Sequence, residues 1–186
     1  TLGELQYPAD IFMKWSVEEK EAIGIYEVVF DDNNKKNEQW YINTNQTFAF
    51  ADGVVTASYD TAIAKSHADS LWTQQDSDDG NLPSDKSVGD VRGEGLKTTL
   101  IRTLKSQVAG ILKDTDWYIT RNTEKSTAIP SSISNHRDAV RTKQAAMEAQ
   151  ITGAADTAAL ETLYTFTEQE NGSVTRPLGE LPVLES

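Results

Sequence analysis

The chain has two histidines, His67 and His136, whose imidazoles could take part in metal binding or catalysis. Two imidazoles beside carboxylates can bind a transition metal, and a histidine between a serine and an aspartate can activate a nucleophile. Neither histidine lies in an H-E-x-x-H pattern, and no Gly-x-Ser-x-Gly sequence provides a nucleophile. His136 shares an apolar helical stripe with Ile133 and Val140, which favours a packed, hydrogen-bonded histidine. We therefore predict no catalytic and no metal-binding residues.

Acidic residues and glycines raise the question of two other kinds of site. Residues 76–90 carry several aspartates, but the D-x-D-x-D-G spacing of a calcium loop is absent. Gly93-Glu94-Gly95 precedes a predicted helix, yet no apolar strand stands before it and no Lys-Thr pair follows in frame. Paired carboxylates such as Asp31-Asp32 are explained by a turn rather than by glycoside hydrolysis. We expect no cofactor and no enzymatic activity.

Apolar and arginine side chains at helical spacing are the better candidates for an interaction site. Ile101, Leu104, Val108 and Ile111 are separated by three, four and three positions. This spacing predicts a buried helical stripe that is too short for an independent coiled coil. It can form one arm of a helical bundle within the chain or across a symmetry axis. In the second case Val108→Asp should yield monomers. The candidate interaction residues are Ile101, Leu104, Val108, Ile111, Trp117, Arg137, Val140 and Arg141.

Three of these candidates, Arg137, Arg141 and Trp117, have alternative interpretations. Arg137 and Arg141 are one helical turn apart and could bind carboxylates of a partner, although a solvated face is the more common role of such residues. The aromatic residues, among them Trp117 and Tyr118, could form a carbohydrate platform. Their positions in strands and on inner faces of helices favour core packing instead.

The N-terminal part of the chain must position its residues with a small sheet. Ser16 and Glu19 are spaced as a capping box, and Gly24 ends the short helix that follows. Strands are expected at residues 25–30, 39–43, 47–51 and 54–59, with a hairpin turn at Asp52-Gly53. This pattern predicts a small antiparallel β-meander with a short entry helix. Such a sheet is marginal alone, so its open face should pack on another element or subunit. Residues 61–72 are expected to be helical.

The C-terminal part is predicted to be helical from Leu96 onwards. Thr115 stands where an N-cap would, with Asp116 in the first turn. Pro130 suits the first position of the next helix, and the last helices are bounded by Gly153 and Asp156. The predicted organisation of this α+β chain is a small α+β domain (1–72), an acidic Gly/Asp-rich linker (73–95), a helical bundle or hairpin (96–168) and an extended tail (169–186).

Composition restricts the partners of the chain. The net charge is −12; residues 1–95 hold 18 acidic and 7 basic side chains, and residues 96–186 hold 11 and 10. This balance argues against nucleic acid, which requires clustered lysine and arginine. The absence of cysteine excludes disulfides and thiol catalysis. No apolar run approaches the roughly 18 residues of a membrane span, so we expect no membrane insertion.

A family resemblance rests on the segment from Leu112 to Arg141. There an Ile-Leu helix end leads to Thr115-Asp116-Trp117, then to Pro130, then to the helical sequence Asn-His-Arg-Asp-Ala-Val-Arg, which runs from Asn135 to Arg141. This order resembles a segment near the C-termini of tailed-bacteriophage tail-fibre proteins and tail-fibre assembly chaperones. The opening Trp-Ser-Val-Glu-Glu-Lys from Trp15 is similar to such chains too. His136 stands where the pattern commonly has tyrosine, and residues 73–95 have no counterpart in it.

The resemblance implies a non-enzymatic structural protein of the phage tail, namely a fibre-associated, adaptor or baseplate-type component. Its partners would be other tail and virion proteins, and we expect a homo-oligomer within that assembly. It would be made in the bacterial host cytoplasm and located in the virion. The alternatives are a tail-fibre assembly chaperone and a capsid or neck accessory protein. An enzyme such as a depolymerase fits least well.

Overall fold

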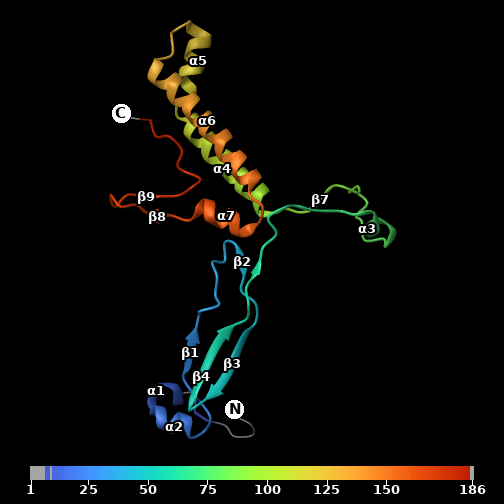
Figure 1. Ribbon diagram of the computed structural model, residues 1–186, viewed down its shortest axis with the longest axis vertical. Coiled ribbons are helices and arrows are strands. Elements are labelled where there is room, and N and C mark those ends of the chain that lie inside the picture. The colour runs from blue at the N-terminus through green and yellow to red at the C-terminus, as the bar shows by residue number, and fades with distance from the viewer. Residues whose placement is uncertain (1–6, 9, 185–186) are drawn as a thin grey trace. The chain divides into compact units, whose positions relative to one another are not determined.

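The computed structural model describes residues 7, 8 and 10–184 and contains both helices and small sheets (Figure 1). The predicted α+β class is confirmed. The chain divides into two compact units, Thr1–Ile63 and Ala64–Ser186. This boundary lies before the one expected at residue 72, because residues 64–72 hydrogen-bond with the start of the helical part.

The first unit opens with two short helices, α1 (Ile11–Lys14) and α2 (Val17–Glu21). The Ser16 hydroxyl accepts a hydrogen bond from the Glu19 amide at 3.2 Å, and the Ser16 amide donates to the Glu19 carboxylate at 2.8 Å. The predicted capping box is therefore confirmed. Gly24 follows with φ of 82°, a conformation that ends the helical run because other residues rarely adopt it.

A three-stranded sheet forms the rest of this unit. Its strands are β1 (Val28–Asp31), β3 (Gln46–Ala51) and β4 (Val54–Tyr59), in the order β1-β4-β3, while β2 (Tyr41–Ile42) lies outside it. β3 and β4 form the predicted hairpin, and both turn residues, Asp52 and Gly53, have positive φ (51° and 80°).

The pairing of β1 differs from the expected antiparallel meander, since β1 lies parallel to β4. The chain between β1 and β3 is long enough to place β1 on the far edge of β4. The Asn34 side-chain amide donates to the Tyr59 carbonyl at 3.0 Å, which ties this connection to the end of β4. Local patterning does not report such a long-range choice of neighbour.

The expected helix over residues 61–72 is wrong. The structure has two short strands there, β5 (Ile63–Ala64), at the boundary of the units, and β6 (Ser70–Leu71). The Ser66 hydroxyl donates to the Ala68 carbonyl, and the Asp69 carboxylate accepts from the Gly95 amide. Such bonds from serine and aspartate to the backbone compete with helix formation.

The segment expected as a linker, residues 73–95, contains secondary structure. It includes α3 (Gln74–Asp78), opened by a capping box between Thr73 and Asp76, and β7 (Val91–Gly93). β7 pairs antiparallel with β6, and Figure 1 shows β7 leading from the loop that carries α3. Hydrogen bonding of the polar residues, rather than an apolar core, orders this segment.

The segment ends at a close joint between Gly95 and Asp69. The Asp69 carboxylate accepts from the Gly95 amide at 2.6 Å and from the Thr98 hydroxyl at 2.9 Å. These two hydrogen bonds, of which the one from Gly95 has the larger effect, lower the pKa of Asp69. A Cβ on Gly95 would overlap the backbone of Ala68, so the joint requires glycine.

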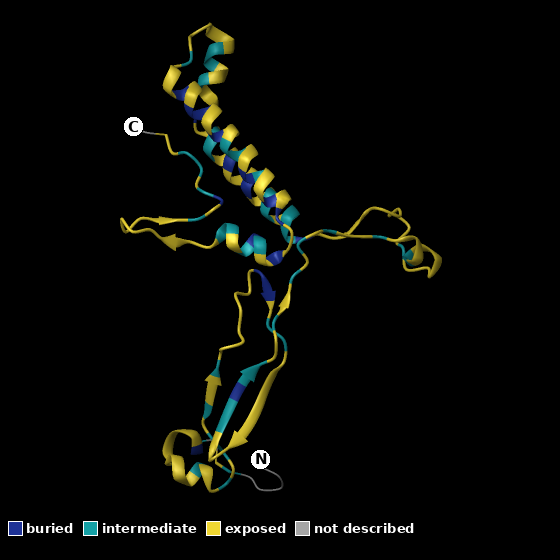
Figure 2. Cartoon of the chain, in the orientation of Figure 1, coloured by how far each residue is buried: buried dark blue, intermediate teal, exposed yellow. Residues whose placement is uncertain are grey.

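The helical part of the second unit is a hairpin of long helices. Its helices are α4 (Leu96–Lys113), α5 (Asp116–Lys125), α6 (Ser131–Gly153) and α7 (Thr157–Tyr164). α4 and α6 lie side by side, and their buried residues face each other along the hairpin (Figures 1 and 2). Leu104 and Val108 of the predicted stripe are buried, as are Val140 and Ile151 of α6. The stripe is thus covered within the chain.

The helix boundaries follow the predicted residues with two differences. α6 ends at Gly153, and the Asp156 carboxylate caps α7 by accepting from the Ala159 amide at 2.8 Å, as predicted. Pro130 is the residue before α6 rather than its first residue. Thr115 occupies the N-cap position of α5, but its side chain does not cap the helix.

The C-terminal part folds back on the helices. β8 (Thr167–Glu168) and β9 (Val174–Thr175) form a hairpin around Asn171 and Gly172, within and just before the segment expected to be an extended tail. Leu178 is buried, and its amide donates to the Leu163 carbonyl at 3.0 Å. None of the helices in the described residues is long and apolar enough to cross a lipid bilayer.

Candidate docking site

Arg137 is buried at the junction of α4, α5 and α6, where it has a structural role. One guanidinium nitrogen, Nη1, donates to the Leu112 carbonyl at 2.7 Å and to the Thr115 hydroxyl at 2.6 Å. The other, Nη2, lies 2.9 Å from the Asp116 carboxylate. The cation therefore lies at the C-terminal end of α4, which the helix dipole makes negative, and also holds the first turn of α5. The side chain of Thr115 serves this junction, which explains why it does not cap α5.

Trp117 and Arg141 are accessible, in contrast to the buried candidates. Trp117 is 51% exposed and stacks on Tyr118, with ring centroids 3.9 Å apart. The Arg121 guanidinium lies 4.7 Å from the Trp117 centroid, a cation–π distance. Arg141 is exposed and lies 3.5 Å from Asp138. The expectation that Trp117 packs inward is wrong, because about half of the residue is exposed.

The eight candidate residues therefore separate into three groups. Four are buried inside the hairpin and its junction: Leu104, Val108, Arg137 and Val140. Ile101 and Ile111 are half-buried, and Trp117 and Arg141 are exposed. Only the last four have surface with which to bind a partner.

Neither histidine belongs to a group of side chains that could hold a metal ion, since the described residues contain no such group. His67 is half-buried, and its carbonyl accepts from the Lys97 amide at 3.1 Å. His136 is buried as expected, but its ring has no hydrogen-bond partner among residues 7, 8 and 10–184. The prediction of a hydrogen-bonded histidine is therefore wrong.

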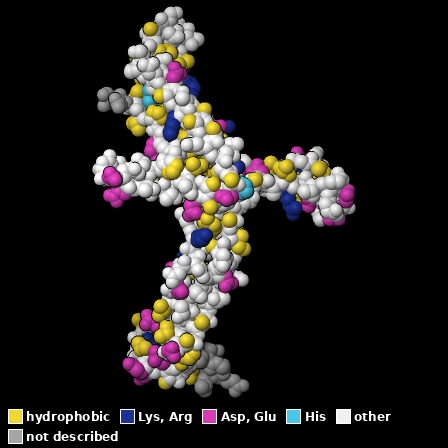
Figure 3. Space-filling model, viewed as in Figure 1, with side chains coloured by type: hydrophobic (Ala, Val, Ile, Leu, Met, Phe, Trp, Pro, Cys, Tyr) yellow, Lys and Arg dark blue, Asp and Glu magenta, His cyan; other side chains and the backbone are white. Residues whose placement is uncertain are grey.

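One face of the sheet in the first unit is mostly apolar and largely uncovered. By strand register, Phe30 and Phe48 flank Ala57, and Val28 and Phe50 flank Val55. The three phenylalanines are 58–65% exposed. Figure 2 shows exposed residues along the whole of β3, and hydrophobic side chains lie at the surface of this unit between acidic ones (Figure 3). We call Phe30, Phe48 and Phe50 the aromatic face.

The opposite face of the same sheet has different chemistry. It carries small or polar side chains such as Thr47, Thr56 and Ser58, and the Thr47 hydroxyl donates to the Ser58 carbonyl at 3.4 Å. A sheet with one polar and one apolar face normally buries the apolar one. Phe50 is in contact with Tyr26, at a centroid distance of 4.6 Å, yet it is still 58% exposed.

The aromatic face was not among the sequence candidates, although its signal is present. Phe48 and Phe50 alternate with alanines, and Val55 and Ala57 alternate with Thr56 and Ser58. Alternation identifies the face, but only the pairing of β1 beside β4 adds Phe30 to it.

Comparison of the chain with models of protein families, with curated proteins and with solved structures found no match. The geometry and the sequence pattern are therefore the basis of the functional proposal.

Proposed function

We propose that this chain is a structural component of a tailed-bacteriophage tail, of fibre-associated, adaptor or baseplate type, that acts by docking on other tail subunits and not by catalysis. The family is proposed from the Leu112–Arg141 pattern. The docking mode rests on one observation, the uncovered aromatic face. The buried candidates of that pattern assemble the helical hairpin, and the docking contact lies elsewhere in the chain.

The size of the aromatic face supports docking. Three phenylalanines at 58–65% exposure leave on the order of 350–400 Å² of aromatic surface in water, if each ring has roughly 200 Å². Patches of about 300–600 Å² are the largest on typical monomers and are often functional. Since residues 1–63 hold 11 acidic and 4 basic side chains, the matching surface would be apolar with a basic rim.

The proposal is tested in particles that carry the chain. A tail component is present in purified virions at a fixed ratio to other tail proteins, measured by quantitative mass spectrometry. An assembly chaperone would leave before the particle matures, and an accessory protein of the capsid or neck would fractionate with heads. Absence from the tail fraction would therefore contradict the proposal.

The docking surface is tested by two neighbouring substitutions on β1. Phe30→Ser removes an exposed ring from the aromatic face, and we expect at least a ten-fold loss of incorporation, typical of an interface anchor. Val29→Ser is the control, because Val29 is exposed on the opposite face of the same strand. The free energy of unfolding of both variants should lie within about 1 kcal/mol of that of the unmodified chain. Equal incorporation of the two would refute docking through this face.

A further inference from the structure

The strand β3 (Gln46–Ala51) is an open edge of the sheet in the first unit. The sheet order β1-β4-β3 places β4 on one side of it, and no strand of the described residues pairs with its other side. In an antiparallel pair, the N–H and C=O groups of alternate residues point away from the partner strand. Half of the β3 residues therefore have backbone groups directed at a further strand, and all six side chains are exposed.

β3 lacks the features that normally protect an edge strand. Proteins protect such strands with charged side chains, prolines, bulges or very short lengths. β3 has the sequence Gln-Thr-Phe-Ala-Phe-Ala, and its register with β4 is unbroken over all six residues. The other edge, β1, is shorter and runs into the charged pair Asp31-Asp32. The edge that is open to pairing is therefore β3.

The charge around β3 favours a second copy of the chain as its neighbour. Residues 1–63 hold 11 acidic and 4 basic side chains, a net charge of −7 that opposes contact between two copies over most of this unit. Residues 39–51 are an exception, since they contain no charged side chain in a chain of which 25% of the residues are charged. A basic partner would find no carboxylate on this strand, whereas a second copy can approach it without meeting a like charge.

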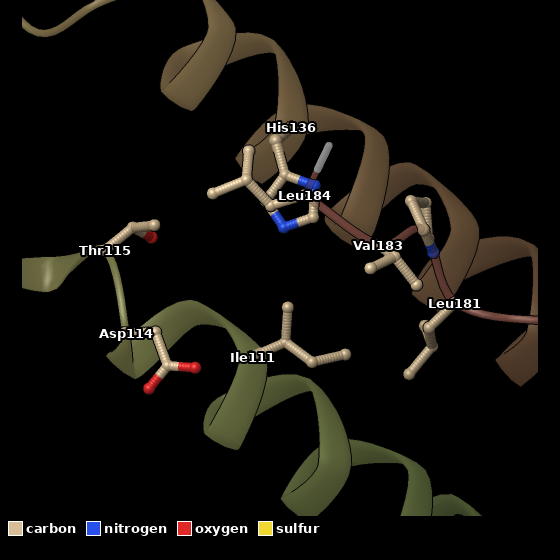
Figure 4. Close-up of a pocket in the computed structure, with 8 residues that line it drawn as sticks. Ile111, Asp114, Thr115, His136, Leu181, Val183 and Leu184 are labelled. Atoms are coloured by element: carbon tan, nitrogen blue, oxygen red, sulfur yellow. The ribbon is translucent and has the colours of Figure 1, made fainter. Parts of the chain in front are cut away.

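The second unit offers no comparable open surface at its apolar cavity. This cavity, of about 270 Å³, lies between α4 and α6, and the chain's own residues 181–184 already line it (Figure 4). β3 has no such cover from its own sheet.

The sequence of β3 also matches itself in the antiparallel direction. With Ala49 opposite Ala49 on a two-fold axis, Phe48 of one copy lies opposite Phe50 of the other, and Gln46 lies opposite Asp52. Pairs of aromatic residues on neighbouring strands are favourable, and no two acidic residues oppose each other in this register. An axis perpendicular to the sheet leaves all the rings on one side of it.

We propose that two copies of the chain pair through β3, antiparallel and with Ala49 on the two-fold axis, to form one six-stranded sheet. Its outer strands are the two protected β1 strands, so the assembly ends at two copies. The two aromatic faces become one continuous surface that stays open to other partners. The pairing does not rest on the proposed tail function, because it concerns the edge of the sheet and is measured on the purified chain.

Cross-linking of the full chain tests the position of the axis, since the chain contains no cysteine of its own. Residues directly opposite each other in an antiparallel pair have Cα atoms about 4.5–5.5 Å apart, within the range that a disulfide spans. Under air oxidation, Ala49→Cys should form covalent dimers at least about ten-fold faster than Val29→Cys. Val29 is the matched control because it is exposed and flanks Thr56 on β1 as Ala49 does on β3. Equal rates of cross-linking would overturn the proposal.

A charged residue on the axis tests the same pairing without a covalent bond. The unmodified chain should dimerise with a dissociation constant on the order of 100 µM, measured by sedimentation equilibrium. Ala49→Lys should weaken this dimer about five-fold, because two lysines then lie opposite each other. Val29→Lys adds the same charge to the same face and should leave the dimer unchanged. Ala49 is exposed, so the variant should keep its fold, which circular dichroism checks. Unchanged association of Ala49→Lys, or a parent chain that stays monomeric at about 1 mM, would refute pairing through β3.

Hydrogen exchange of the unmodified chain gives a measurement that needs no variant. Amides of β3 that bond across the axis should exchange more slowly with deuterium as the protein concentration rises, while those of β1 should not change. Slowing in β1 instead, or in neither strand, would contradict the proposal.

Discussion

Arg137 and Arg141 lie one helical turn apart on α6 and have opposite environments. Arg137 is 7% exposed and is bonded to Leu112, Thr115 and Asp116, which belong to the end of one helix and the start of the next. Arg141 is exposed beside Asp138. The same residue type at equivalent spacing therefore connects three helices in one case and meets solvent in the other.

This contrast predicts different costs of removal. Arg137→Ala should lower the free energy of unfolding by about 3 kcal/mol, because it leaves the half-buried Leu112 carbonyl and the buried Thr115 hydroxyl without their donor and removes a packed side chain. Arg141→Ala should change it by less than about 0.5 kcal/mol. Urea denaturation followed by circular dichroism measures both values. Similar costs for the two variants would show that the buried junction contributes little.

Residues with local roles were predictable from the sequence, and residues with tertiary roles were not. Ser16, the Asp52-Gly53 turn and Asp156 act on backbone groups two or three positions away, so their neighbours suffice to assign them. Thr115 has the sequence of a cap, but its hydroxyl is bonded to Arg137, far along the chain. Trp117 is exposed, and local periodicity does not report which sides of a helix are covered in the fold.

At the scale of elements, α4 and α6 form the core of the second unit. The stripe on α4 was predicted from its spacing, and its partner is α6 of the same chain. The sequence left open a partner across a symmetry axis, because a stripe of two heptads is equally suited to both. The parallel placement of β1 beside β4 was unpredictable for a similar reason, since strand order depends on contacts distant in sequence.

Burial of the stripe inside the hairpin changes the expected effect of Val108→Asp. An unpaired carboxylate against α6 should destabilise the fold by about 3 kcal/mol or more, rather than only separate subunits. Ala109→Asp, on the exposed side of the same turn, should cost about 1 kcal/mol or less. Thermal unfolding measures both, and sedimentation measures mass. A stable, monomeric Val108→Asp variant of an oligomeric parent would restore the intermolecular interpretation.

At the scale of the whole chain, the two units differ in how much core they contain. In the second unit, Leu104, Val108, Val140 and Leu160 are buried within the helices, and Leu178 of the tail adds to them. The first unit buries Ile11, Trp40, Tyr41 and Ala57, while its phenylalanines remain in water. A small sheet with one uncovered face is marginal by itself.

We therefore expect the two units to behave differently as fragments. Residues 64–186 alone should unfold cooperatively with a helical spectrum, at a temperature within a few degrees of the helical transition of the full chain. Residues 1–63 alone should lack a cooperative transition, because a domain of about 60 residues has little core. Differential scanning calorimetry and circular dichroism measure both. Loss of cooperative unfolding in the larger fragment would show that residues 64–186 depend on residues 1–63 for their stability.

The contact between Asp69 and Gly95 makes residues 70–94 an insertion whose two ends lie next to each other. The chain leaves at Asp69 and returns to the same point, where the Leu96 and Lys97 amides also bond to the carbonyls of Ser66 and His67. What lies between is held mainly by its own short strands and capping box. The free-energy cost of closing a loop rises by only about 0.6 kcal/mol for each doubling of its length, so this segment can be lengthened, shortened or replaced at little thermodynamic cost. Insertions or deletions in residues 70–94 should therefore leave the helical hairpin unchanged.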